Sequence, residues 1–141
     1  MDVFSEAGGL SEGFIRAGFT PIGHVEADRP ACYTMKTRVV YHWLTKQDRQ
    51  DEYIDYLKGE KTRSDLYGLV PESEIASIIN LKIGKESLSD IFSRIDQLLD
   101  GQSLDLIAGG PPCQAYSLVG RSRSGETMLS DKRNYLYKYY A

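Results

Sequence analysis

Short apolar segments alternate with helical segments along this chain, and the alternation limits the folds open to it more than any other feature. The segments "MDVF", "TPIGHVEA" and "LDLIA" are short and largely apolar, which is typical of strands. Apolar residues keep a helical period from Leu10 to Ala17 and again between Ser87 and Gly101. Apolar strands separated by helices indicate a parallel sheet covered on both faces, so the sequence predicts an α/β fold.

Capping signals predict where the helices begin and end. Gly18 is expected to end the first helix. Asp28 is expected to cap a second helix that runs to about Arg38. Ser87 and Asp90 resemble a capping box at the start of a later helix, and "LDLIA" then predicts a buried strand.

Residues 41–84 differ from the rest because they are polar and rich in charge. They predict short helices and an exposed connection, an insertion-like part of a single unit that spans residues 1–141. Within this region "PESEIASIIN" predicts a helix, and Asp131 predicts the start of another near the end of the chain.

Composition excludes several classes of protein. No apolar run approaches the roughly 20 residues of a membrane span, so no membrane partner is expected. The chain contains two cysteines, Cys32 and Cys113, so a disulfide framework is not expected. A cytoplasmic location is therefore expected. No metal site is predicted. The net charge of -3 means that any nucleic-acid contact must come from a local patch or from another part of the protein.

Three distinctive segments, "SEAGG", "EAD" and "GGPPCQ", follow predicted strands. Parallel strands end at one edge of a sheet, and ligands bind outside that edge, so these segments predict one shared site. Gly8 and Gly9 allow a tight turn beside a ligand or simply a structural turn. Glu26 lies about twenty residues after that turn, where a carboxylate accepts ribose hydroxyls in dinucleotide folds; a solvated acid is the alternative.

Cys113 follows an unusually constrained backbone. The prolines hold Gly110 and Pro111 in a stiff, extended path, and Gly109 and Gly110 leave room above the strand for a flat substrate. This frame favours a functional thiol over a small buried hydrophobe. For Cys32, inside a predicted helix, the buried structural role is favoured.

These motifs resemble those of DNA cytosine-5 methyltransferases, and the resemblance spans the chain with a divergent middle. "DVFSEAGGLSEGF" is similar to the first motif of the family, "GGPPCQAYS" to the fourth and "DKRNYLYKYY" to the fifth. The resemblance implies a Rossmann-like, S-adenosylmethionine-dependent enzyme of restriction-modification. It also implies that the Cys113 thiolate adds to C6 of a cytosine flipped out of duplex DNA, so that C5 can be methylated.

The resemblance also implies roles for individual residues. Cys113 would be catalytic. The DNA-contacting set would lie in a mobile loop: Gln114, Ser117, Arg121 and Arg123. The cofactor set would comprise the first loop, the ends of two strands and two later positions: Phe4, Ser5, Ala7, Gly8, Gly9, Glu26, Ala27, Asn80, Pro112 and Leu136.

The chain departs from the family pattern at several points. Glu6 stands where a glycine is common in the first motif, and Asn80 is only a candidate for the adenine contact of the third motif, usually an acidic residue. The chain is interpreted as the amino-terminal part of a truncated domain. It lacks the glutamate that would hold cytosine N3, the target-recognition region and the returning terminal helix. We therefore expect the fragment alone to be inactive and to self-associate or be partly disordered over 41–84.

Three alternatives remain open from the residues. The chain could be an inactive fragment that binds the cofactor or a partner subunit, an RNA-directed relative with the same motifs, or an unrelated nucleotide-binding domain. An "ENV"-like triplet after Ala141 would distinguish them.

Overall fold

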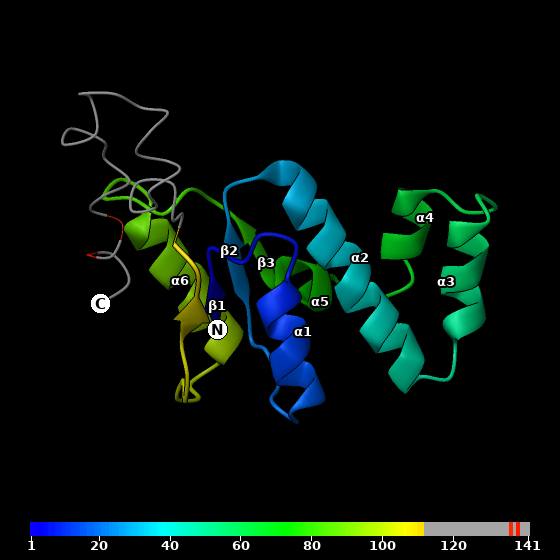
Figure 1. Ribbon diagram of the computed structural model, residues 1–141, viewed down its shortest axis with the longest axis horizontal. Coiled ribbons are helices and arrows are strands. Elements are labelled where there is room, and N and C mark those ends of the chain that lie inside the picture. The colour runs from blue at the N-terminus through cyan, green and yellow to red at the C-terminus, as the bar shows by residue number, and fades with distance from the viewer. Residues whose placement is uncertain (112–135, 137, 139–141) are drawn as a thin grey trace, which may run out of the picture.

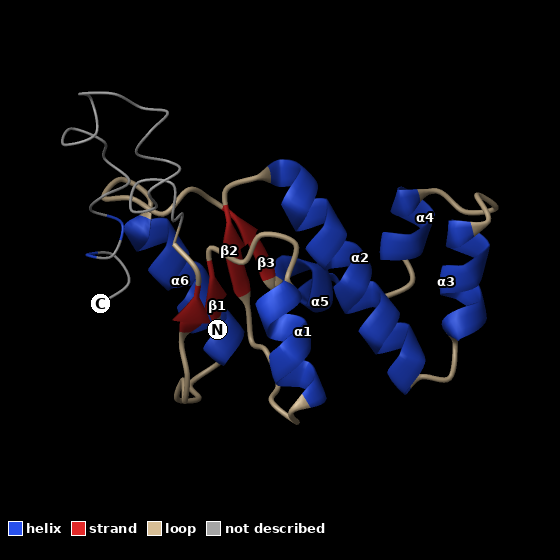
Figure 2. Cartoon of the chain, in the orientation of Figure 1, coloured by secondary structure: helices blue, strands red, loops and turns tan. Residues whose placement is uncertain are grey.

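Four short strands form one parallel sheet in the part of the chain that the structure describes, residues 1–111, 136 and 138 of a computed structural model. The strand order is β3-β2-β1-β4 (Figures 1 and 2). The strands span Asp2–Val3 (β1), His24–Glu26 (β2), Ile78–Asn80 (β3) and Ala108–Gly109 (β4). Because every pair is parallel, all four strands end at the same edge, which we call the carboxyl edge.

Helices connect the strands and cover both faces of the sheet (Figure 1). The helices span Gly9–Arg16 (α1), Arg29–Lys46 (α2), Gln50–Leu57 (α3), Arg63–Tyr67 (α4), Glu72–Ala76 (α5) and Leu88–Leu99 (α6). This order of elements confirms the predicted α/β, Rossmann-like fold.

Strand register divides the sheet side chains between the two faces. Val3, Val25 and Ile79 are paired across β1, β2 and β3, and they pack with Ile91 and other residues of α6. Burying side chains such as Val25 and Ile79 stabilises the fold by about 1.5–3 kcal/mol each.

The neighbouring row of the sheet faces the other way. Ile78 packs against Cys32 and Met35 of α2, and the Asp2 and His24 side chains contact Ser11 of α1. Helices α1 and α2 therefore cover one face, and α6 covers the other.

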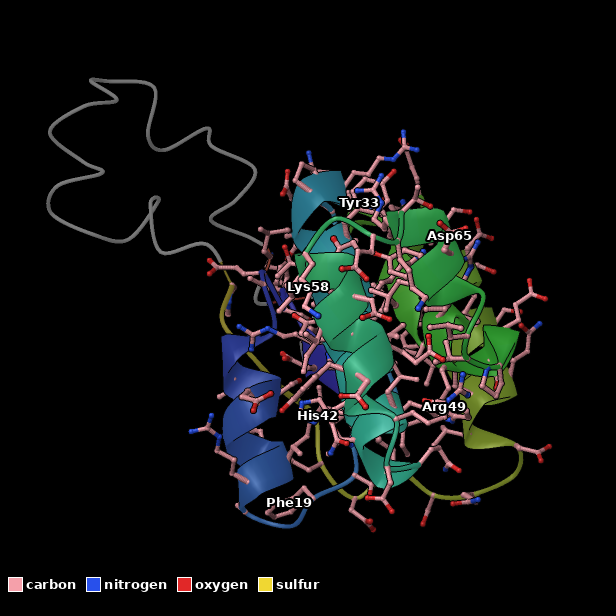
Figure 3. The ribbon with its side chains drawn as sticks, turned by 90° about the vertical axis from the view of Figure 1, so that its right-hand side faces the viewer. Phe19, Tyr33, His42, Arg49, Lys58 and Asp65 are labelled. Atoms are coloured by element: carbon pink, nitrogen blue, oxygen red, sulfur yellow. The ribbon has the colours of Figure 1, made fainter. Side chains whose placement is uncertain are left out.

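A second core, made of Val40, Leu44, Leu66 and Val70, lies away from the sheet. It joins the later half of α2 to α4 and its following turn, and aromatic residues of α3 pack around it. Figure 3 views this side of the molecule, with α3 in front. Residues 47–70 therefore rest on α2 rather than on the sheet.

Several predicted boundaries are confirmed. Gly18 follows α1 with a φ of 90°, the left-handed backbone of a glycine stop. The Asp28 side chain caps α2 by accepting from the Ala31 N–H at 2.9 Å. The helix runs to Lys46 rather than Arg38, because Val40 and Leu44 extend its buried face into the second core.

Three local predictions were wrong. The helix expected over 71–80 is instead α5 followed by β3, because Ile78 and Ile79 pair with β2. Ser87 precedes α6 without capping it, since its hydroxyl donates to carbonyls of the preceding turn. The segment "LDLIA" is mostly exposed and only its end forms β4, which pairs on one side, with β1. The helix expected from Asp131 lies outside the described residues.

Candidate functional site

The carboxyl edge brings together the segments that the sequence singled out. The 4–8 loop follows β1. Glu26 is the last residue of β2, Asn80 of β3 and Gly109 of β4. Ala27 follows β2, and residues 110–111 follow β4. In Figure 1 these ends point toward the same side of the sheet as the start of α2. The expected convergence on one edge is therefore present for every segment that the structure describes.

Left-handed backbone marks the 4–8 loop. The φ angles of Phe4, Glu6 and Gly8 are 56°, 47° and 80°. Such angles are uncommon for residues with a Cβ and cluster at functional sites. A Cβ at Gly8 would also lie 3.2 Å from Met35 Cγ, so glycine suits that position on two counts. Glu6 has a Cβ, yet its backbone has the conformation that glycine favours.

Glu26 lies between two backbone segments and accepts a hydrogen bond from each. Its Oε2 accepts from the Glu6 N–H at 2.8 Å, and its Oε1 accepts from the Asp28 N–H at 2.8 Å. The side chain is half-buried. The carboxylate is thus held in one orientation at the junction of the 4–8 loop and α2.

Asn80 bridges the ends of β3 and β2. Its Nδ2 donates to the carbonyl oxygens of Glu26 at 2.9 Å and Ala27 at 3.0 Å. The side-chain amide therefore fixes the backbone that carries Glu26.

Gly109 allows β4 to approach β1 closely. A Cβ at this position would overlap the Val3 carbonyl oxygen and lie 2.7 Å from Val3 Cγ2. Only glycine fits this strand end, which leads directly into the predicted cysteine motif. Pro112, Cys113, Gln114, Ser117, Arg121 and Arg123 lie outside the described residues.

The remaining candidates differ in exposure. Ser5 is 5% exposed and its hydroxyl donates to the Asp2 carbonyl at 2.9 Å. Phe4 packs against the core on the α6 face. Ala7, Gly9 and Ala27 are exposed at the edge, and Leu136 is half-buried.

A buried polar cluster beneath α1 was not predicted. Ser11 Oγ donates to Asp2 Oδ2 at 2.6 Å and lies 3.2 Å from His24 Nδ1. All three residues are at most 6% exposed, and Asp2 Oδ1 has no partner among the described residues. An acidic residue inside the apolar segment "MDVF" was the available signal, since a buried charge requires polar partners.

Cys32 has the environment of a structural cysteine. It is 2% exposed, and its Sγ lies 3.5 Å from the Glu26 carbonyl oxygen. Burial, with the nearby Glu26 and Asp28 charges, raises the pKa of the Cys32 thiol. A thiol held protonated in this way is a poor nucleophile.

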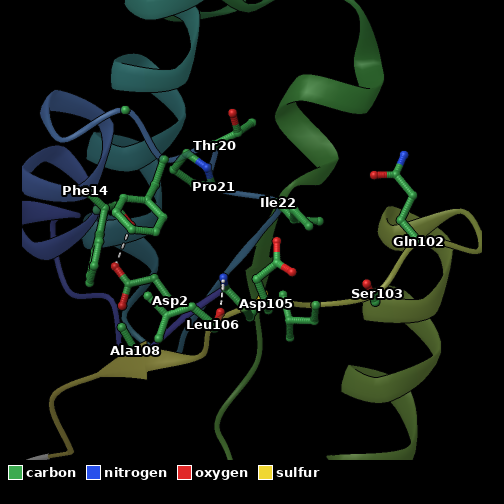
Figure 4. A pocket seen from close by; sticks show the side chains of 15 residues that line it. Asp2, Phe14, Thr20, Pro21, Ile22, Gln102, Ser103, Asp105, Leu106 and Ala108 are labelled. Atoms are coloured by element: carbon green, nitrogen blue, oxygen red, sulfur yellow. Dashed lines mark hydrogen bonds between the residues drawn. The ribbon is translucent and has the colours of Figure 1, made fainter.

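A pocket of about 370 Å³ lies at the opposite end of the sheet (Figure 4). Its wall includes Asp2, the 20–22 segment that precedes β2 and the 102–106 segment that precedes β4. It is therefore separate from the carboxyl edge.

The residues that the structure describes contain no cluster of three or more His, Cys, Asp or Glu side chains that could hold a metal ion. Their helices include none with the length and apolar character needed to cross a membrane.

A parallel α/β sheet with an acidic residue at the end of β2 and a glycine loop after β1 resembles the arrangement of dinucleotide-binding folds. Residues 72–141 match the family model described as C-5 cytosine-specific DNA methylase. The type II methyltransferase M.Bpa9945I of Bacillus paralicheniformis is 39% identical over 99% of this chain and 36% of its own length. M1.HphI of Haemophilus parahaemolyticus is 28% identical over 99% of this chain and 27% of its own length. No solved structure gives a significant match.

The chain belongs to the C-5 cytosine-specific DNA methylase family. Methyltransferases generally use S-adenosylmethionine as the methyl donor. The chain spans between about a quarter and about a third of the length of these two relatives.

Proposed function

We propose that this chain supplies the cofactor edge and the nucleophile of a DNA cytosine-5 methyltransferase of a restriction-modification system. The observation that carries the proposal is the convergence of the 4–8 loop, Glu26 and the Gly109–Pro111 segment on one edge of a parallel sheet. The family match and the type II methyltransferase relatives support it.

The residues of the carboxyl edge fit S-adenosylmethionine. Glu26 presents a fixed carboxylate with lone pairs left for ribose hydroxyls, because each of its oxygens accepts one backbone N–H. Gly9, at the start of α1, is exposed and would meet the amino-acid portion, and Phe4 and Ala27 would contact the adenine. When bound, the cofactor would supply an electrophilic methyl group.

Cys113 would perform the nucleophilic step. Addition of its thiolate to cytosine C6 would place electron density on C5, the atom that becomes methylated. Loss of the C5 proton and elimination of the thiolate would then restore the aromatic ring and the free enzyme. The target cytosine must leave the duplex to reach this thiol, which is why we propose base flipping.

The residues after Cys113 would contact DNA. Gln114, Ser117, Arg121 and Arg123 follow the nucleophile closely in sequence, and the two arginines suit phosphate contacts. The free thiol that this chemistry needs suits a reducing cytoplasm.

A matched pair of cysteine variants tests the proposal in the full-length protein. Cys113→Ser should reduce methyl transfer from labelled donor to mixed-sequence DNA by at least about 10³-fold, with cofactor affinity measured by calorimetry close to that of the wild type. Cys32→Ser makes the same chemical change at a buried position and should retain activity. Ordinary turnover by the Cys113→Ser protein would refute the covalent mechanism. The 141 residues alone should give no turnover.

A further inference from the structure

The 4–8 loop adopts a conformation that its own sequence disfavours. Phe4 and Glu6 have positive φ angles of 56° and 47°, and neither is a glycine. A left-handed backbone costs free energy at a residue with a Cβ, so it persists only where surrounding contacts enforce it. The left-handed backbone of Glu6 must therefore be held by contacts with other residues.

The Glu26 carboxylate makes a contact of this kind with the Glu6 backbone. It accepts the Glu6 N–H at 2.8 Å, and no other acceptor for that N–H is present among the described residues. The same carboxylate accepts the Asp28 N–H at 2.8 Å, so it joins the loop after β1 to the start of α2. Both distances are in the range of charge-assisted hydrogen bonds, which are stronger than neutral ones.

The backbone of Glu26 is itself fixed. It is paired with Asn80 of β3, and the Asn80 side chain donates to its carbonyl oxygen at 2.9 Å. Neighbouring Val25 accepts from the Ser5 N–H at 3.2 Å. The carboxylate therefore acts on the loop from a rigid strand end.

We infer that Glu26 is a positioning residue, which holds the left-handed 4–8 loop in its binding conformation before any cofactor arrives. This role adds to the ribose contact and rests on the proposed function only where a ligand is concerned. A carboxylate has about four lone-pair sites, so the two backbone bonds and two ribose hydroxyls can be accepted together. The loop and the carboxylate are then a single preorganised unit.

Amide hydrogen exchange of the cofactor-free protein tests the positioning role. Glu26→Gln keeps the size of the side chain, but its amide has only one oxygen. That oxygen can replace only one of the two carboxylate oxygens that accept the backbone N–H groups. We expect exchange of the Glu6 or Asp28 amide, measured by NMR, to accelerate by about tenfold or more. The Ile91 amide, which bonds within the α6 region, should be unchanged and reports that the fold is intact. Glu26→Ala removes both acceptors and should accelerate both amides.

Glu6→Gln is the matched control, because it removes a carboxylate from the same loop without changing the backbone N–H. It should leave both amides at their wild-type rates. Unchanged exchange at Glu6 and Asp28 in both Glu26 variants would overturn the inference.

A ligand arm separates this role from the ribose contact. Glu26→Gln should weaken binding of S-adenosylhomocysteine and also of its 2′,3′-dideoxy analogue, which has no ribose hydroxyls to lose. If only the hydroxylated ligand is weakened, Glu26 acts through the ribose alone and the inference fails. If the wild-type protein binds neither ligand, the proposed function fails, while the exchange measurement still decides the positioning role.

Discussion

Asn80 provides a sharp test of how the carboxyl edge is held together. Its Nδ2 donates two hydrogen bonds, at 2.9 Å and 3.0 Å, to backbone carbonyls at the end of β2. A net hydrogen bond contributes about 0.5–1.5 kcal/mol, so Asn80→Ala should cost about 1–3 kcal/mol, with the lower half expected because the side chain is exposed to water. Asn80→Asp is the stronger perturbation, since a carboxylate cannot donate and instead faces two carbonyl oxygens. We expect it to cost about 1 kcal/mol more than Asn80→Ala.

Urea unfolding followed by circular dichroism measures these differences. Gln97→Glu makes the same amide-to-carboxylate change on the exposed surface of α6 and should stay within about 0.5 kcal/mol of the wild type. If Asn80→Asp proves as stable as the wild type, or more stable than Asn80→Ala, the amide does not bridge the two strands and our description of the edge is wrong.

Two further predictions concern other parts of the fold. Gly109→Ala should destabilise the protein by about 2 kcal/mol or more in urea unfolding, because the new methyl group overlaps Val3. A Cβ at Gly110 meets no atom of the described residues within 4 Å, so Gly110→Ala should cost clearly less; equal costs would contradict the close approach of β4 to β1. The hydrogen bond from His42 lowers the pKa of Glu12 below its ordinary 4.5, so this carboxylate stabilises the fold above about pH 4.5 and the contribution is lost as pH falls through the lowered pKa. Glu12→Gln should therefore flatten the stability profile on the acid side of pH 4.5, and an unaltered profile would show that the pair contributes nothing.

Local signals in the sequence predicted much of the sheet and its edge. The glycine loop, Glu26 and the Gly109 segment each lie at the end of a strand. Because parallel strands end at the same edge of a sheet, the sequence predicted that these segments share one edge. Family resemblance supplied the roles of the individual site residues, and all of these roles remain proposals.

Longer-range pairings explain the predictions that failed. Ile78 and Ile79 fit a helical period within their own segment, and only pairing with β2, more than fifty residues earlier, makes them a strand. The bridge from Asn80 to Glu26 depends on that same pairing and could not be predicted from either residue alone. The Asp2 cluster combines residues from two strands and a helix, so the acidic residue in "MDVF" signals a buried charge but does not indicate its partners.

Helix α2 has a consequence for how the molecule opens. Its early residues Cys32 and Met35 belong to the sheet core, whereas Val40 and Leu44 belong to the second core. Proteins open in cooperative units of unequal stability, and a unit boundary would fall within this one helix. We therefore expect residues 47–70 to open more readily than the sheet core. This outer unit also contacts an early turn of α2, because the Tyr67 hydroxyl donates to the Tyr33 carbonyl at 2.9 Å, and the chain continues from it through α5 into β3. Changes in the length or sequence of the outer unit would then reach the carboxyl edge both through α2 and through β3.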